Sequence, residues 1–95
     1  MGLKDFLKSP FGTEEHQRIV SYASRQFPKS TPLERAAFER GLKMQEGDID
    51  NIDYCFRKAI GDLQLNFNGY KTLKHFFQLG AEADMKEVLP QRFVD

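Results

Sequence analysis

The chain has 95 residues and a formal net charge of zero, because 14 lysines and arginines balance 14 aspartates and glutamates. This length accommodates one small domain, and the balanced charge argues against a general polyanion binder, which would carry excess basic residues. Cys55 is the only cysteine, so a disulfide-stapled secreted scaffold is excluded. We expect one helical domain over residues 1–95, with a short amphipathic segment at 1–10 and a tail at 90–95.

The N-terminal residues contain neither a long apolar run nor a small-residue cleavage site, so they do not read as a signal peptide. Uncharged runs are far shorter than the roughly 20 residues that a membrane span needs. We therefore expect a cytoplasmic protein without a membrane span. Its general character is that of small bacterial or phage accessory proteins, and no motif identifies a family.

Apolar residues recur at helical spacing along the whole chain, without the sustained alternation that a strand would show. A short amphipathic turn is predicted at 3–8, with Leu3, Phe6 and Leu7 on one side. Thr13 is the predicted N-cap of a second helix, which Pro28 ends.

The sequence Thr31-Pro32-Leu33-Glu34 is the clearest helix start, because it combines an N-cap threonine, a proline at the first helical position and a capping-box glutamate. The third helix is predicted to end near Gln45. Its buried side is predicted to consist of Leu33, Ala36, Ala37, Phe38 and Leu42.

Three further helices are predicted in the second half of the chain. Asp48 or Asp50 is expected to cap the fourth, which carries a stripe formed by Ile49, Ile52, Phe56, Ala59, Ile60 and Leu63. Residues 66–69 are predicted to form a turn, followed by helices at 70–79, ended by Gly80, and at 82–89. The sequence thus predicts an all-α fold: a compact bundle of five or six short helices.

Gly41 and Gly61 fall inside the predicted third and fourth helices. A glycine in a helix costs up to about 1 kcal/mol relative to alanine. Each is therefore predicted to mark a close helix crossing.

Metal and catalytic motifs are weak in this sequence. An EF-hand alignment beginning at Asp48 fails, because Ile52, Asp53 and Ala59 fall where a ligand, a glycine and a glutamate are needed. His16 and His75 lie far apart and share no ligand spacing with Cys55, which is predicted to be a small core residue. Phosphate-binding loops and nucleophile elbows are also missing, so we expect no cofactor, no metal and no enzymatic activity.

Charge is distributed in blocks along the chain. Residues 46–56 hold four acidic residues and no basic one, whereas residues 57–75 hold four basic residues and one acidic one. Such a dipolar surface suits docking to a larger protein, or association into a homodimer. The leading hypothesis is an adaptor, regulator or inhibitor, and its predicted partner-binding residues are Glu46, Asp48, Asp50, Asp53, Arg57, Lys71 and Lys74.

Nucleic-acid binding is the alternative hypothesis. If Gly69 formed the turn of a helix-turn-helix, the following helix would present a basic face. That face would consist of Lys71, Lys74, His75 and Gln78. The bulky Leu65 and Phe67 count against it, because the turn of this motif needs tight packing.

Overall fold

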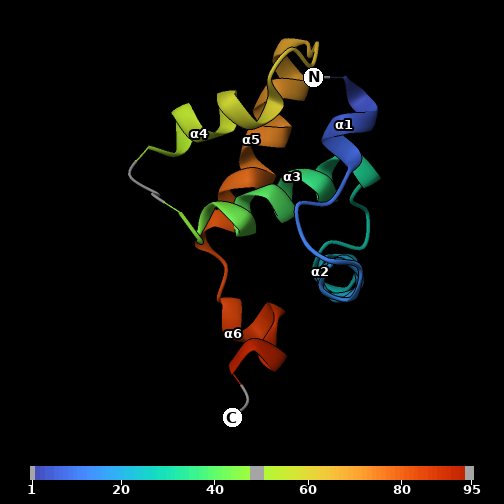
Figure 1. The fold of residues 1–95 in the computed structure, drawn as a ribbon. Helices are drawn as coiled ribbons and strands as arrows, with labels where there is room; N and C mark the ends of the chain where they lie inside the picture. The colour runs from blue at the N-terminus through green and yellow to red at the C-terminus, as the bar shows by residue number, and fades with distance from the viewer. Residues whose placement is uncertain (1, 48–50, 94–95) are drawn as a thin grey trace.

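The computed structural model describes residues 2–47 and 51–93, and every regular element in these ranges is helical. The predicted all-α class is therefore confirmed for the described chain (Figure 1). The elements are α1 (Leu3–Leu7), α2 (Thr13–Gln26), α3 (Pro32–Met44), α4 (Ile52–Ile60), α5 (Phe67–Glu82), α6 (Met85–Val88) and the 3-10 helix η1 (Pro90–Phe93).

Helix α3 crosses α5 at a steep angle in the centre of the molecule (Figure 1). The crossing is made at two glycines, Gly41 on α3 and Gly80 on α5, which are both buried. A Cβ atom added to Gly41 would lie 2.0 Å from the carbonyl oxygen of Phe77, and one added to Gly80 would lie 2.0 Å from that of Phe38. The two backbones therefore touch, and any side chain at either position would force them apart.

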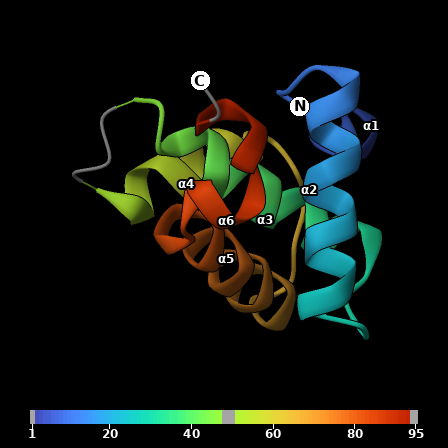
Figure 2. The same ribbon diagram turned by 90° about the horizontal axis from the view of Figure 1, so that it is seen from below.

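Two hydrophobic clusters flank this crossing. The first gathers buried residues of α1, α3, α4 and α5: Phe6, Ala36, Ala37, Phe56, Ile60, Leu73 and Phe77. The second joins α2, α3 and the C-terminal segment: Phe11, Ile19, Ala23, Phe38, Leu42, Val88 and Leu89. Helix α3 contributes to both clusters, and Figure 2 shows it between α2 on one side and α4 and α5 on the other.

The predicted core faces of the central helices are largely confirmed. Four of the five residues named for the third helix are buried, and Leu33 is half-buried. On α4, Phe56 and Ile60 are buried, and Ile52 and Cys55 pack against the first cluster from its edge. Ile49 lies outside the described residues.

The capping box of α3 is present as predicted. The Glu34 amide donates to Thr31 Oγ1 over 3.1 Å, and the Thr31 amide donates to Glu34 Oε1 over 2.8 Å. Because both ends of this exchange are satisfied, the start of the central helix is fixed locally. The helix ends at Met44, with Gln45 as its C-cap.

Two other predicted N-caps are wrong. Gly12, not Thr13, precedes α2, so the threonine is the first helical residue. Neither Asp48 nor Asp50 caps α4; Asn51 does so, since its side chain accepts a hydrogen bond from the Tyr54 amide over 3.0 Å. An asparagine three residues before that amide has the reach that the cap requires.

The predicted bounds of the fifth and sixth helices also need correction. Residues 66–69 form the first turn of α5, because the Asn66 side chain accepts a hydrogen bond from the Gly69 amide over 2.6 Å. Gly80 does not end α5 but lies within it, at the crossing. The sixth helix begins only at Met85, capped by Asp84, and ends at Val88.

Gly61 does not mark a helix crossing, contrary to the prediction. It is the C-cap of α4 and has a φ of 54°, the only positive φ among the described residues. A residue with a side chain is strained in this conformation, so glycine serves here to end the helix. On α1, Phe6 is buried, whereas Leu3 and Leu7 are 51% and 40% exposed. No described helix is both long enough and apolar enough to cross a membrane.

Replacing Gly41 by alanine is expected to destabilise the domain by about 2–3 kcal/mol, as for overpacked cores. Alanine gains about 1 kcal/mol of helix propensity, but a Cβ atom at 2.0 Å from a backbone oxygen cannot be relieved by a side-chain rotation. Urea unfolding of Gly41→Ala measures the loss. Gly47→Ala is the control, because its Cβ would meet only the Met44 carbonyl oxygen at 3.9 Å. Equal stability of both variants would contradict the close crossing.

Candidate functional site

Part of the predicted docking surface is an internal ion-pair network. Lys74 on α5 and Arg57 on α4 contact the two carboxylate oxygens of Asp53, at 2.7 Å and 3.4 Å. The Lys74 hydrogen bond, together with Arg57, holds the pKa of Asp53 below its ordinary value. Arg57 also donates to the Tyr70 hydroxyl over 3.2 Å. These opposite charges therefore join α4 to α5.

Glu46 belongs to a second network, which ties the C-terminal segment to the bundle. Lys43 and Arg92 each lie 2.7 Å from Glu46, and Arg92 also contacts Glu15 on α2. The Arg92 guanidinium lies 5.4 Å from the centre of the Phe11 ring. Hydrogen bonds from Lys43 and then Arg92 lower the pKa of Glu46, and the Arg92 hydrogen bond lowers that of Glu15.

The predicted partner-binding residues thus fall into separate groups. Asp53, Arg57 and Lys74 lie together, whereas Glu46 lies in the other network. Asp48 and Asp50 lie outside the described residues. Lys71 is exposed on α5.

The basic face predicted for nucleic acid is interrupted. Lys71, His75 and Gln78 are exposed along α5, but Lys74 is directed to Asp53 on α4. Gln78 donates to Glu82 over 3.2 Å, which adds a carboxylate to the same face. The described face therefore offers one unpaired lysine, Lys71, rather than a row of cations.

A buried carboxylate lies where the loop after α1 meets α2 and α3. Glu39 is only 3% exposed; its Oε2 accepts a hydrogen bond from the Ser9 hydroxyl and lies 2.8 Å from His16 Nδ1. The Ser9 hydroxyl also accepts a hydrogen bond from the Phe11 amide over 3.0 Å. The serine bonds to the carboxylate and not to the imidazole, which is not the order of a nucleophilic triad. This cluster fixes the loop.

Arg40, the next residue on α3, holds the C-terminal end of α1. Its guanidinium donates to the carbonyl oxygens of Asp5, Phe6 and Lys8 and lies 4.9 Å from the centre of the Phe6 ring. Partial burial lowers the pKa of Arg40, but a guanidinium stays charged at neutral pH. These acceptors are neutral carbonyl oxygens, and the attraction of the neighbouring Glu39 carboxylate partly offsets the effect of burial on this pKa.

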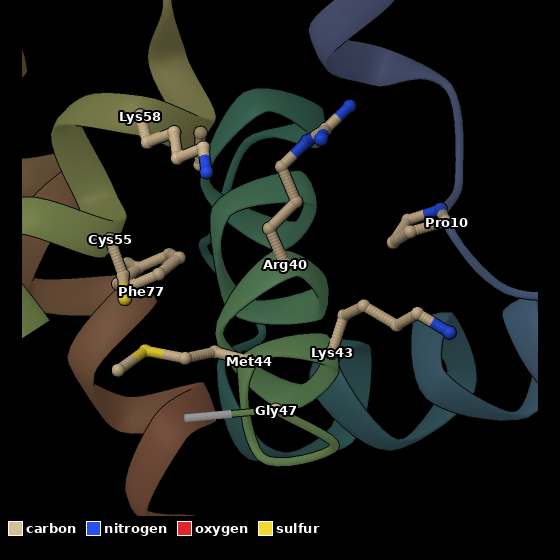
Figure 3. Close-up of a pocket in the computed structure, with 9 residues that line it drawn as sticks. Pro10, Arg40, Lys43, Met44, Gly47, Cys55, Lys58 and Phe77 are labelled. Atoms are coloured by element: carbon tan, nitrogen blue, oxygen red, sulfur yellow. The ribbon is translucent and has the colours of Figure 1, made fainter. Parts of the chain in front are cut away.

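An open cleft of about 370 Å³ extends across α3, from α4 and α5 on one side to the loop after α1 on the other, and Figure 3 shows it in close-up. Its described lining is Pro10, Arg40, Lys43, Met44, Gly47, Cys55, Lys58, Ala59 and Phe77. In Figure 3, Met44 extends toward Cys55 and Phe77, and Lys58 extends from α4 toward α3. The floor of the cleft, formed by Met44, Ala59 and Phe77, is therefore apolar. The flexible methionine can adapt its shape to a bound side chain.

The rim of this cleft is positively charged. Three of its described lining residues are cations and none is acidic. Lys43 is compensated by Glu46, but Lys58 is exposed and has no carboxylate partner among the residues that the structure describes. Arg40 on α3 and Lys58 on α4 therefore bring positive charge to an apolar floor, and neither forms an ion pair within the described residues.

Within residues 2–47 and 51–93, no three His, Cys, Asp or Glu side chains are grouped so that they could hold a metal ion. The predicted small-core role of Cys55 is refined, since this half-buried residue also lines the cleft. The ring centres of His75 and Phe76 are 5.9 Å apart. The other histidine, His16, is far away in the sequence and contacts Glu39.

Sequence reasoning missed the residues that build this region. In the sequence, Lys58 is only one of the four basic residues in the block at 57–75. No motif in the sequence points to Arg40. Periodicity gives no signal for the burial of Glu39, because this residue falls in the arc of α3 that Ala36, Ala37, Phe38, Gly41 and Leu42 leave open. The cleft itself depends on the placement of α4, which no local pattern encodes.

Comparisons with known proteins add no identification, because no family model, curated protein or solved structure matches this chain.

The Arg92 network makes stability depend on pH in a defined direction. The pKa values of Glu15 and Glu46 are lower in the folded protein than their ordinary value of 4.5. Their contribution is thus complete above about pH 4.5 and is lost as the pH falls through the lowered folded values. Arg92→Met keeps an apolar stem over Phe11 but removes the charge.

We expect Arg92→Met to cost about 1 kcal/mol at pH 7, the upper range for partly exposed ion pairs, and much less near pH 3. Urea unfolding of both proteins at the two pH values measures the difference. A cost that is the same at both would show that Arg92 acts through packing alone.

Proposed function

We propose that this protein is a small non-catalytic interaction module of the cytoplasm, which acts as an adaptor, regulator or inhibitor by docking a larger protein. The observation that carries the proposal is the cleft across α3, which combines an apolar floor with the cations Arg40 and Lys58, neither of them ion-paired within the described residues. Apolar contact supplies binding energy, and charge at the rim selects and orients the partner.

Two features favour a protein partner over a small molecule. The cleft has a volume of about 370 Å³, near the lower end of the roughly 300–1,000 Å³ of ligand pockets. It is also open, so a small ligand would keep much of its surface in water. A protein segment can leave its outer face in solvent and still bury one side against Met44 and Phe77.

The arrangement of charge favours protein over nucleic acid. Nucleic-acid binding draws on several lysines and arginines aligned with phosphates, whereas Lys74 and Arg57 are engaged with Asp53. The nucleic-acid alternative therefore rests mainly on Lys71. A homodimer is compatible with the proposal only if the second copy occupies the same cleft.

Matched charge reversals test this function. Tagged wild type, Lys58→Glu and Lys71→Glu are used to capture partners from nuclease-treated host lysate. Both lysines are exposed on helices, and only Lys58 lines the cleft. We expect stoichiometric capture of a protein by wild type and Lys71→Glu, and at least a fivefold loss with Lys58→Glu, which corresponds to about 1 kcal/mol.

The opposite pattern would contradict the proposal. Capture from untreated lysate that survives Lys58→Glu, but is lost after nuclease treatment or with Lys71→Glu and Lys74→Glu combined, would establish the nucleic-acid alternative. Circular dichroism of each variant verifies that the helices are retained.

A further inference from the structure

The cleft carries enough chemistry to define the kind of segment that it binds, and this inference rests on the proposed function. We infer that the occupant is a short amphipathic helix of a partner protein, with bulky apolar residues on one face and carboxylates beside them. The floor and the rim each contribute to this assignment.

The floor requires apolar anchors. Met44 from α3, Ala59 from α4 and Phe77 from α5 present carbon and sulfur to the cleft, and Pro10 lines it from the other side of α3. Burying apolar side chains against such a surface is the main source of affinity in a small interface. Met44 is half-buried and flexible, so it can accommodate leucine, isoleucine or phenylalanine.

The rim requires carboxylates. Arg40 and Lys58 stand on the two helices that border the floor, and no acidic residue lies among the described lining. A cationic partner would be repelled by both, whereas a neutral partner would cover them without compensation. A carboxylate beside the apolar residues would pair with the exposed Lys58, and the charge of Arg40, whose guanidinium is bonded to the end of α1, would attract a second one.

The shape favours a helix. The cleft is bordered by α4 and by the loop after α1, with α3 beneath it, and a helix that enters such a groove places apolar side chains at i, i+3, i+4 and i+7 on one face. Its remaining residues stay in solvent, which agrees with the open side of the cleft. A lipid would need an enclosed tunnel to bury both sides of its chain, and the cleft does not provide one.

The single cysteine of the chain provides a direct test. Cys55 lines the cleft and is half-buried, so its reaction rate with iodoacetamide reports on cleft occupancy. The probe is a fluorescein-labelled, acetylated and amidated peptide with leucines at i, i+3, i+4 and i+7 and glutamates elsewhere. Its matched control has glutamine in place of every glutamate.

Fluorescence anisotropy and Cys55 alkylation are measured on the full chain at low and high salt. We expect the acidic peptide to bind at least about fivefold more tightly than its glutamine control, and to lose this advantage at high salt. Saturating peptide should slow alkylation of Cys55. Lys58→Glu should weaken binding about five- to tenfold, whereas Lys71→Glu should change it less than twofold.

Failure of this inference is distinguishable from failure of the proposed function. If neither peptide binds but partner capture still depends on Lys58, the function stands and the acidic helix is wrong. If the acidic peptide binds without protecting Cys55 and equally well to Lys58→Glu, it binds elsewhere and the inference is overturned. Protection of Cys55 by a fatty acid but not by the peptide would overturn it in favour of a lipid.

Discussion

The backbone contact between Gly41 and Gly80 is the constraint on which the rest of the structure depends. With no side chain at either position, α3 and α5 meet at van der Waals distance. The remaining helices pack on either side of this crossing. Phe38 and Phe77 contribute the carbonyl oxygens at the contact, yet their rings fill different hydrophobic clusters. The crossing therefore joins the two halves of the core.

Polar side chains on α3 then position the segments around the cross. Glu39 fixes the loop that follows α1. Arg40 holds the end of that helix by donating hydrogen bonds to its carbonyl oxygens. Gln45 donates to the carbonyl oxygens of Gly80 and Ala83, over 2.7 and 2.9 Å, at the end of α5. Helix α4 packs mainly on α5 and touches α3 little, which leaves room for the cleft across α3. The candidate site is thus a consequence of how the core is assembled.

Local signals in the sequence were sufficient for the helical class and for the strongest cap, because the Thr31–Glu34 exchange involves only neighbours in the chain. They failed where a residue has two possible roles. Gly80 alone predicts a helix stop, but it lies inside α5, where the absence of a side chain allows the close approach of α3. Asp53 and Lys74 were interpreted as parts of a docking surface, but they contact each other across two helices. A single sequence shows the charges and not their partners.

Native-state hydrogen exchange, followed amide by amide in the free protein, tests the central claim most directly. If the glycine crossing supports the fold, the slowest amides will lie in α3 and α5 around Gly41 and Gly80, and will exchange only through global unfolding. Helix α4, which borders the open cleft, will exchange faster through local opening. Equal protection of α4, or rapid exchange at the crossing, would contradict the account.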